Sequence, residues 1–187
     1  MEKSELTRRD VELKLASIGD YVKMDYLQAC LKKQVDFDTR KFVLTTLSGI
    51  YESKKMFLDA GKILRAGAEI NVTFDAKMSD YMKSADLLIK AGAFDESDIS
   101  FTKALACATD IQKANLKVKR KEMYKKQAQE YLQKDKRKHA MESFEKLLEI
   151  DLQGDEKKVA QATLLGLYEK LGKIKEYSNL KRSMSKN

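Results

Sequence analysis

A run of basic residues between positions 113 and 138 is the part of the sequence with the clearest potential for binding chemistry. It holds eleven lysines and arginines and only three acidic residues, so it accounts for the whole formal net charge of +8. Such a concentrated charge predicts an acidic partner, either an acidic protein, a nucleic-acid backbone or an anionic membrane surface. The candidate partner-binding residues in this basic run are Lys113, Lys117, Lys119, Arg120, Lys121, Lys125 and Arg137.

Residues suited to catalysis are sparse and do not form a known catalytic pattern. The chain has one histidine, His139, and it lacks the GxSxG, GxxxxGK[ST], GxGxxG and HExxH patterns. Its many carboxylates alternate with lysines, which is typical of a solvated helix face with weak ion pairs. We therefore expect no enzymatic activity, no cofactor and no metal site, and we expect His139 to be an exposed helical residue.

The cysteines and the apolar segments indicate where the protein resides. Cys30 and Cys107 stand far apart and neither belongs to a CxxC pair, which argues against a disulfide framework and a zinc site. We expect both to be buried small apolar residues. The N-terminus is charged from its second residue, and no window approaches the roughly 18 consecutive apolar residues of a membrane helix. These features predict a soluble cytoplasmic protein without an integral membrane segment.

The elements that position the basic run are predicted to be helices in an internal repeat. The 187 residues include no proline and only eight glycines, a composition that disfavours the many turns of an all-β fold. Residues 81–108 and 124–150 align at one constant spacing. The matched pairs are Tyr81/Tyr124, Ala85/Ala128, Leu88/Tyr131, Gly92/Asp135, Ser97/Ala140, Phe101/Phe144, Ala104/Leu147 and Leu105/Leu148.

The repeat has a readable period along the chain. Poorer copies extend it in both directions, and the equivalent turn residues are Gly19, Lys55, Gly92, Asp135 and Gly172, at intervals of 36, 37, 43 and 37. Each copy carries two stripes of apolar residues at spacings of three and four, which predicts two helices separated by a turn. One such pair cannot bury both stripes alone, so the copies must stack into a helical solenoid.

The predicted fold is therefore all-α, with about five stacked helix–turn–helix units in a single domain over residues 1–187. The units span about 4–35, 38–70, 75–113, 116–152 and 155–184. The predicted helices are 4–18, 21–33, 39–53, 55–69, 76–91, 95–113, 116–133, 136–151, 156–171 and 173–184. Asp38, Asp75 and Asp155 are the expected helix N-caps, and Gly92 and Gly172 are the expected left-handed C-caps.

Two kinds of substitution probe this assignment. Phe101→Ala and Phe144→Ala should each be strongly destabilising, because the aligned phenylalanines are expected between helices. If Gly92 has a positive φ at a helix end, Gly92→Ala should also destabilise. Gly61 falls inside a predicted helix, so Gly61→Ala is expected to be neutral or stabilising.

These residues resemble the tetratricopeptide family, whose repeat of about 34 residues is a helix–turn–helix unit with small and aromatic residues at fixed spacing. Residues 124–150 carry the resemblance best, through Tyr124, Ala128, Tyr131, Ala140 and Phe144. The resemblance implies a right-handed solenoid that serves as a scaffold for a protein or peptide, without enzymatic activity. The longer intervals are similar to those of the soluble NSF attachment protein branch of such solenoids.

The sequence departs from the tetratricopeptide pattern in two respects. The glycine expected early in the first helix and the proline that usually closes a unit are missing. The subgroup that grips a C-terminal carboxylate would need asparagine at positions where this chain has Gly49, Asp86 and Gln129, and only Arg137 has a matching residue type. A peptide with a free carboxylate is therefore not the favoured ligand.

Helical geometry suggests how the basic run is presented. At 100° per residue, Lys113, Lys117, Arg120 and Lys121 fall within about 60° of Tyr124, which shares the packing stripe of the repeat. Four unpaired cations are too costly to bury, so the stripe must leave the packed unit there. Either the helix projects beyond its neighbours or the chain breaks near Asn115.

The sequence thus favours a non-enzymatic adaptor that binds an acidic protein partner, either as a helix in a groove or as an extended peptide. The alternative is nucleic-acid or ribonucleoprotein binding through the basic run. Base stacking would need aromatic residues within the run, and only Tyr124 and Tyr131 are present. Both are better used in core packing.

Overall fold

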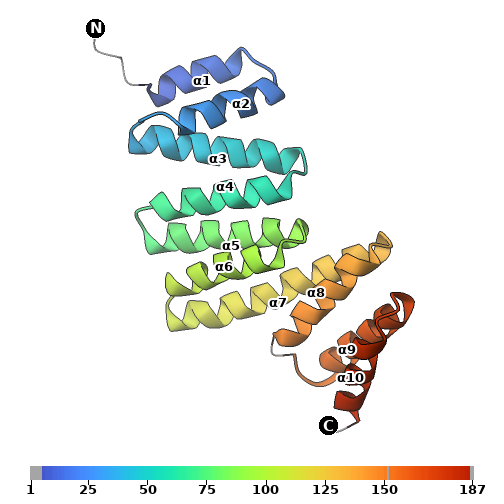
Figure 1. Ribbon diagram of the computed structural model, residues 1–187. Coiled ribbons are helices and arrows are strands. Elements are labelled where there is room, and N and C mark those ends of the chain that lie inside the picture. Colours follow the sequence, from blue (N-terminus) through green and yellow to red (C-terminus); the bar gives the residue numbers. More distant parts are fainter. Residues whose placement is uncertain (1–5, 151, 186–187) are drawn as a thin grey trace. The chain divides into compact units, whose positions relative to one another are not determined.

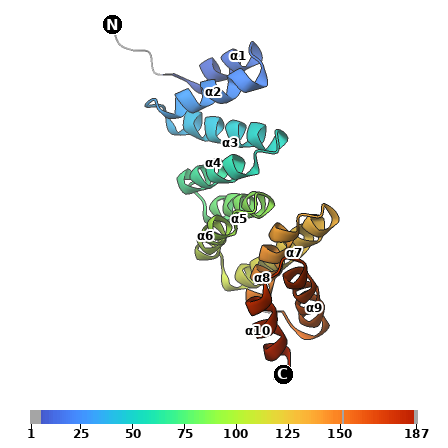
Figure 2. The same cartoon turned by 45° about the vertical axis from the view of Figure 1, so that its right-hand side comes forward.

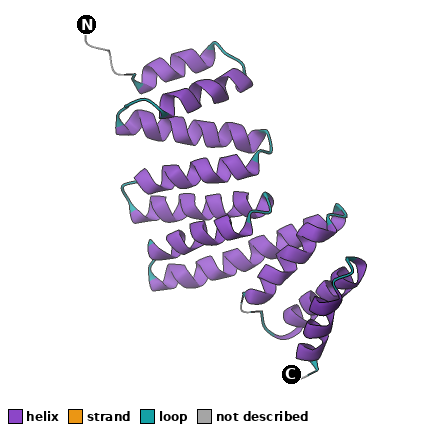
Figure 3. Ribbon diagram, in the orientation of Figure 1, coloured by secondary structure: helices purple, strands orange, loops and turns teal. Residues whose placement is uncertain are grey.

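The computed structural model describes residues 6–150 and 152–185 and confirms that the protein is all-α, with no strand among those residues (Figures 1 and 3). None of the helices in these residues is both long and apolar enough to cross a membrane. The described helices are α1 (Arg8–Ala16), α2 (Asp20–Leu31), α3 (Phe37–Ser53), α4 (Phe57–Ile70), α5 (Phe74–Lys90), α6 (Phe94–Ala106), α7 (Asp110–Gln133), α8 (Arg137–Glu149), α9 (Gly154–Lys170) and α10 (Ile174–Met184).

Packing divides the chain into two compact units, one ending at Lys113 and one beginning at Ala114. In the first unit, consecutive helices from α2 to α6 pack side by side (Figure 2). In the second unit, α9 packs against both α8 and α10. Sequential packing of this kind is compatible with a helical repeat. The single domain over 1–187, the right-handed twist and the count of about five repeats stay predictions.

Four of the five predicted turn residues adopt the left-handed backbone conformation. The φ angle is 60° at Lys55, 74° at Gly92, 52° at Asp135 and 67° at Gly172, whereas Gly19 has φ −78° and is the N-cap of α2. After each of these four residues the next backbone N–H donates to the carbonyl five positions earlier, which closes the helix with a Schellman turn. These hydrogen bonds are Met56 to Tyr51 at 2.9 Å, Ala93 to Leu88 at 2.9 Å, Lys136 to Tyr131 at 2.8 Å and Lys173 to Tyr168 at 2.8 Å.

Most of the predicted core residues are buried where the repeat alignment places them, but the aligned pair Leu105 and Leu148 is only half-buried. Phe101 and Phe144 have exposed fractions of only 4% and 7%. The aligned small and aromatic residues of the two best copies are also buried, namely Tyr81, Tyr124, Ala85, Ala128, Leu88, Tyr131, Ala104 and Leu147. Cys30 is buried as expected, but Cys107 lies at the end of α6 and is only half-buried. Small residues in the first helix of a unit therefore let the neighbouring helices approach closely.

The largest error of the sequence interpretation concerns the boundary between the sixth and seventh helices. We expected helices over 95–113 and 116–133 with a break near Asn115, but α7 runs through Asn115 without interruption. The chain turns earlier, because Thr109 and Gln112 form a capping box. The Thr109 N–H donates to Gln112 Oε1 at 2.8 Å, and the Gln112 N–H donates to Thr109 Oγ1 at 3.4 Å.

The predicted N-cap residues are displaced by two positions. The caps of α3 and α5 are Asp36, which accepts from the Thr39 N–H at 2.8 Å, and Thr73, which accepts from the Ala76 N–H at 3.2 Å. The cap of α9 is Gln153, which makes no side-chain capping bond. Asp38, Asp75 and Asp155 lie instead in the first turns of these helices, where the helix dipole favours a carboxylate.

Gly61 is a point of close approach between α4 and α5. A Cβ atom at this position would lie 2.7 Å from Leu88 Cγ and 3.2 Å from the Ser84 carbonyl oxygen. The Ser84 hydroxyl donates to the Gly61 carbonyl at 2.7 Å, which holds the two helices together there. Gly61 lies inside a helix as expected, but these distances reverse the expectation for Gly61→Ala, which should now destabilise the protein.

Candidate functional site

Two of the seven candidate cations converge on one acidic residue. Lys121 and Lys125 are one turn apart on α7, so they share a face, and Glu156 lies in the first turn of α9. Lys125 Nζ is 3.0 Å from Glu156 Oε1, and Lys121 Nζ is 3.1 Å from Glu156 Oε2. Lys125 and Lys121 hold the pKa of the Glu156 carboxyl below its usual value, and Glu156 raises the pKa of Lys125.

The other candidate cations do not join this cluster. Lys113 pairs with Asp110 at 3.0 Å, and Arg137 pairs with Asp135 at 2.8 Å, so both have local acidic partners. The Arg120 guanidinium is half-buried, with its carbon 5.7 Å from the centroid of the neighbouring Tyr124 ring.

Lys117 and Lys119 are exposed and have no ion-pair partner among the described residues. Of the four cations expected where the stripe leaves the packed unit, only Lys117 is exposed, whereas Lys113, Arg120 and Lys121 are half-buried. The predicted chain break near Asn115 is absent, because α7 is continuous through that residue. A role of the seven residues in partner binding stays a prediction.

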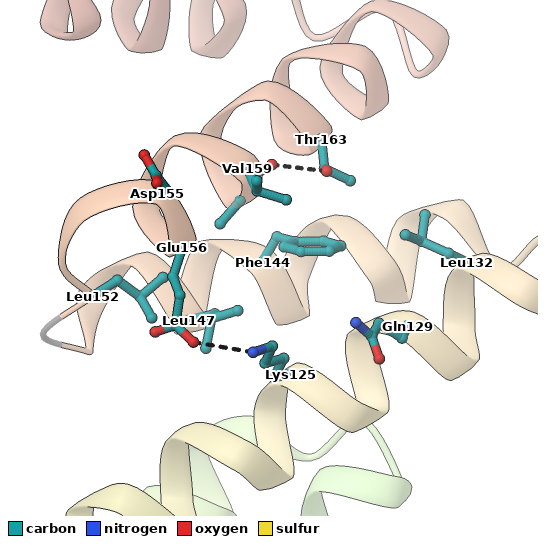
Figure 4. A pocket seen from close by; sticks show the side chains of 11 residues that line it. Lys125, Gln129, Leu132, Phe144, Leu147, Leu152, Asp155, Glu156, Val159 and Thr163 are labelled. Carbon is teal, nitrogen blue, oxygen red and sulfur yellow. Dashed lines mark hydrogen bonds and ion pairs between the residues drawn. The ribbon is translucent and has the colours of Figure 1, made fainter.

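A groove of about 400 Å³ opens beside the Lys125–Glu156 ion pair (Figure 4). Its wall on α7 consists of Lys125, Gln129 and Leu132, and its wall on α9 includes Glu156 and Val159. The remaining lining residues are Phe144, Leu147, Leu152, Asp155, Ala160 and Thr163. The groove is thus mostly apolar, with charged side chains at one end and the Gln129 amide and Thr163 hydroxyl further along.

Helical spacing explains why these side chains face the same groove. Positions 125, 129 and 132 recur at four and three, and positions 156, 159 and 163 recur at three and four, so each set occupies one helix face. Seven residues rise by about 10 Å in an α-helix, so each wall is about two turns long. Phe144 and Leu147 come from α8.

The walls of the groove expose two hydrophobic side chains to water. Val159 is 65% exposed and Leu132 is 37% exposed. Val159 lines the groove together with the buried Phe144, and Leu132 follows the buried Tyr131 in the sequence. The sequence analysis did not identify Leu132 or Val159. Each is an apolar residue that lies outside the core stripe of its helix, on a face where the neighbouring residues are mostly charged. This pattern indicates a binding surface only once the structure places the two residues on opposite walls of one groove.

His139 is exposed, as expected, and its ring lies 5.2 Å from that of Tyr131, measured between centroids, with the planes tilted by 44°. It stands in the first turn of α8. Across the described residues, no three histidine, cysteine or acidic side chains gather in a way that could hold a metal ion.

Comparison with protein-family models and with curated proteins finds no match to this chain. The resemblance to tetratricopeptide repeats therefore depends on the aligned residues themselves. The packed helices and the four Schellman turns at aligned positions are compatible with a helical repeat.

Proposed function

We propose that the protein is a non-enzymatic, tetratricopeptide-like scaffold that binds an acidic amphipathic helix of a partner protein in the groove formed by α7, α8 and α9. The observation that supports this most is the exposed apolar groove at the end of a strongly basic helix. Val159 and Leu132 present hydrophobic side chains to solvent on opposite walls, next to Lys125. Exposed apolar surface with a polar rim is typical of an interaction site.

The dimensions of the groove favour a helical partner. Its walls are about two helical turns long, and an amphipathic helix presents apolar side chains at positions i, i+3 or i+4, and i+7 over that same length. Such a stripe can fill a groove between helices with three anchors, which is a recurrent mode of peptide recognition. An extended peptide would place alternate side chains on opposite sides, so fewer of them would enter the groove.

The charge of the basic run favours an acidic partner, while the charged residues that line the groove itself are Lys125, Asp155 and Glu156. The basic run, most of which lies in α7, carries a net charge of +8, and Lys117 and Lys119 in it have no ion-pair partner among the described residues. Acidic side chains on the flanks of the partner helix would be attracted to this surface and would raise the association rate. The absence of catalytic patterns from the sequence supports the non-enzymatic part of the proposal.

The test uses a synthetic amphipathic helix of about 14 residues, roughly 20 Å long, with leucines at i, i+3, i+7 and i+10 and glutamates on both flanks. A second peptide carries glutamines in place of the glutamates. We expect the glutamate peptide to bind the wild-type protein, and the glutamine peptide to bind more weakly and with a shallower dependence on salt. Isothermal titration calorimetry at two salt concentrations measures both.

A matched pair of variants locates the binding surface. Val159→Asp places a carboxylate in the groove wall, whereas Val22→Asp makes the same change at a valine that is 56% exposed on α2, in the other unit. Losing one buried valine contact costs about 1.5 kcal/mol, so Val159→Asp should weaken binding about tenfold and Val22→Asp should not. Equal affinities of the two variants would rule out the groove.

Nucleic-acid binding is the outcome that would replace this proposal. A protein that neutralises several phosphates shows an affinity that falls steeply with salt, by about 0.9 log units per phosphate for each log unit of salt. If a duplex or single-stranded oligonucleotide binds with such a slope while neither peptide binds, the basic run serves nucleic acid and the groove does not serve a partner helix.

A further inference from the structure

Glu156 forms ion pairs with two lysines of α7, namely Lys125, which lines the groove, and Lys121, one turn before it. One carboxylate oxygen contacts Lys125 at 3.0 Å and the other contacts Lys121 at 3.1 Å (Figure 4 shows the pair with Lys125). Both lysines belong to α7 and Glu156 belongs to α9, so the ion pairs join the two walls of the groove at its charged end. An acidic partner helix lying in the groove would bring its own carboxylates to this same place.

We propose that Glu156 is an internal competitor for the partner's carboxylates, so that an acidic helix enters the groove by displacing Glu156 from Lys121 and Lys125. This inference rests on the proposed function, because it concerns how that same groove is regulated. It assigns the chain a built-in limit on its affinity for acidic partners. It also means that a neutral amphipathic helix does not have to compete with Glu156.

The ion pairs are exposed enough for such an exchange. The side chains of Glu156 and Lys125 are each 41% exposed, and that of Lys121 is 26% exposed. Ion pairs at this level of exposure contribute little to stability, because water solvates the separated charges well. Replacing the Glu156 carboxylate by a partner carboxylate exchanges one such pair for another, and the Glu156 side chain can turn toward solvent without moving α9.

Other charges near Glu156 make a controlled comparison feasible. Asp155 is its neighbour in the sequence and also lines the groove, but it pairs with Lys158, at 3.4 Å, and not with a lysine of α7. Glu122 on α7 adds to the negative charge that Lys125 experiences. Asp155→Asn therefore changes the net charge by the same amount as Glu156→Gln without releasing Lys121 or Lys125.

The experiment compares wild-type, Glu156→Gln and Asp155→Asn for binding of the glutamate peptide described above and of its glutamine counterpart. Removing one carboxylate about 4 Å from a cation in a watery environment should tighten binding of the glutamate peptide by about fivefold in Glu156→Gln. Asp155 also lines the groove but pairs with Lys158 and with neither Lys121 nor Lys125, so Asp155→Asn should tighten binding of the glutamate peptide by a smaller factor, about twofold. The glutamine peptide should bind all three proteins equally.

A third variant checks that the released lysines cause the gain. Adding Lys121→Gln and Lys125→Gln to Glu156→Gln should abolish the fivefold increase for the glutamate peptide. Thermal unfolding followed by circular dichroism verifies that each variant is folded, which the exposure of these side chains leads us to expect.

The outcomes separate this inference from the proposed function. If the glutamate peptide binds wild-type protein and Glu156→Gln equally, or if Asp155→Asn tightens binding as much as Glu156→Gln, then Glu156 is not a competitor while the groove remains the binding site. If neither peptide binds any of the three proteins, both the proposed function and this inference are wrong. Weaker binding by Glu156→Gln would show that Glu156 supports the site instead of limiting it.

Discussion

Replacing Gly61 by alanine tests the close approach of α4 and α5. The new Cβ atom would lie 2.7 Å from Leu88 Cγ, 3.0 Å from Leu88 Cδ2 and 3.2 Å from the Ser84 carbonyl oxygen. Carbon atoms in contact prefer about 3.5–4.0 Å, so at least one of these groups must move. Leu88 has an exposed fraction of 0% and is packed on all sides, and the Ser84 oxygen belongs to the backbone of α5.

The expected loss of stability follows from two opposing terms. Alanine is favoured over glycine inside a helix by about 1 kcal/mol, whereas overpacking a close-packed core costs about 1–3 kcal/mol. If α4 moves away from α5 to make room, the 2.7 Å hydrogen bond from the Ser84 hydroxyl to the Gly61 carbonyl is also weakened, which adds about 1 kcal/mol. We expect Gly61→Ala to lower the free energy of unfolding by about 1–3 kcal/mol in total.

Gly49 provides a matched control within the same unit. It lies inside α3, it is exposed, and a Cβ atom there would have no neighbour within 4 Å. Gly49→Ala should therefore stabilise the protein by about 0.5–1 kcal/mol through helix propensity alone. Urea unfolding followed by circular dichroism measures both variants. If Gly61→Ala is as stable as Gly49→Ala, the packing of α4 on α5 is looser than these distances indicate.

Three further predictions concern the core, the turns and pH. Phe101→Ala and Phe144→Ala should each lower the free energy of unfolding by about 3–5 kcal/mol, and unchanged thermal midpoints would contradict the repeat register. Gly92 has a φ of 74°, so Gly92→Ala should lower the free energy of unfolding by about 1 kcal/mol. Lys55 has a φ of 60°, so Lys55→Gly should raise it by about 0.5 kcal/mol. Urea midpoints in the opposite order would contradict the assigned turns. Because Lys125 and Lys121 lower the pKa of Glu156, any stability that wild-type protein has over Glu156→Gln is present above the usual glutamate pKa and declines as the pH falls through the folded-state pKa. The difference between the urea midpoints of these two proteins should shrink as the pH falls below the usual glutamate pKa, and a difference that does not change with pH would contradict the pairing.

The repeat could be predicted from the sequence because the spacing of the apolar core residues and the positions of the turns indicate the same register. Gly92 and Asp135 align with each other, and both adopt positive φ although only one is glycine. The spacing of the apolar residues located the turn at Asp135, where residue type alone would not have done so. The aligned core pair Phe101 and Phe144 is buried for the same reason, since one register places both between helices.

The errors arose where two local signals competed or where a contact is long-range. Asp36 and Asp38 can both cap α3, and the choice of Asp36 is made by its bonds to the Thr39 backbone and hydroxyl. Asn115 is a plausible cap, but the capping box at Thr109 starts the helix earlier. The close approach at Gly61 depends on a leucine 27 positions later, which no local pattern reveals.

The basic run was visible in the sequence, but the groove was not. Charge is additive along a chain, so counting lysines and arginines was enough to find the run. The groove depends on side chains from three helices, and its apolar walls use Leu132 and Val159, which lie outside the core stripe of their helices. The pairing of Lys121 and Lys125 with Glu156 likewise joins residues more than 30 positions apart.

Chemical-shift mapping by nuclear magnetic resonance tests the central claim most directly. Titrating the glutamate peptide into isotopically labelled wild-type protein reports on every backbone amide at once. The account predicts that the largest perturbations fall on residues 125–132, 144–147 and 155–163, and that they diminish in Val159→Asp but not in Val22→Asp. Perturbations confined to residues 134–139, or to residues 6–113, would show that an acidic helix binds elsewhere and would contradict the assignment of this groove.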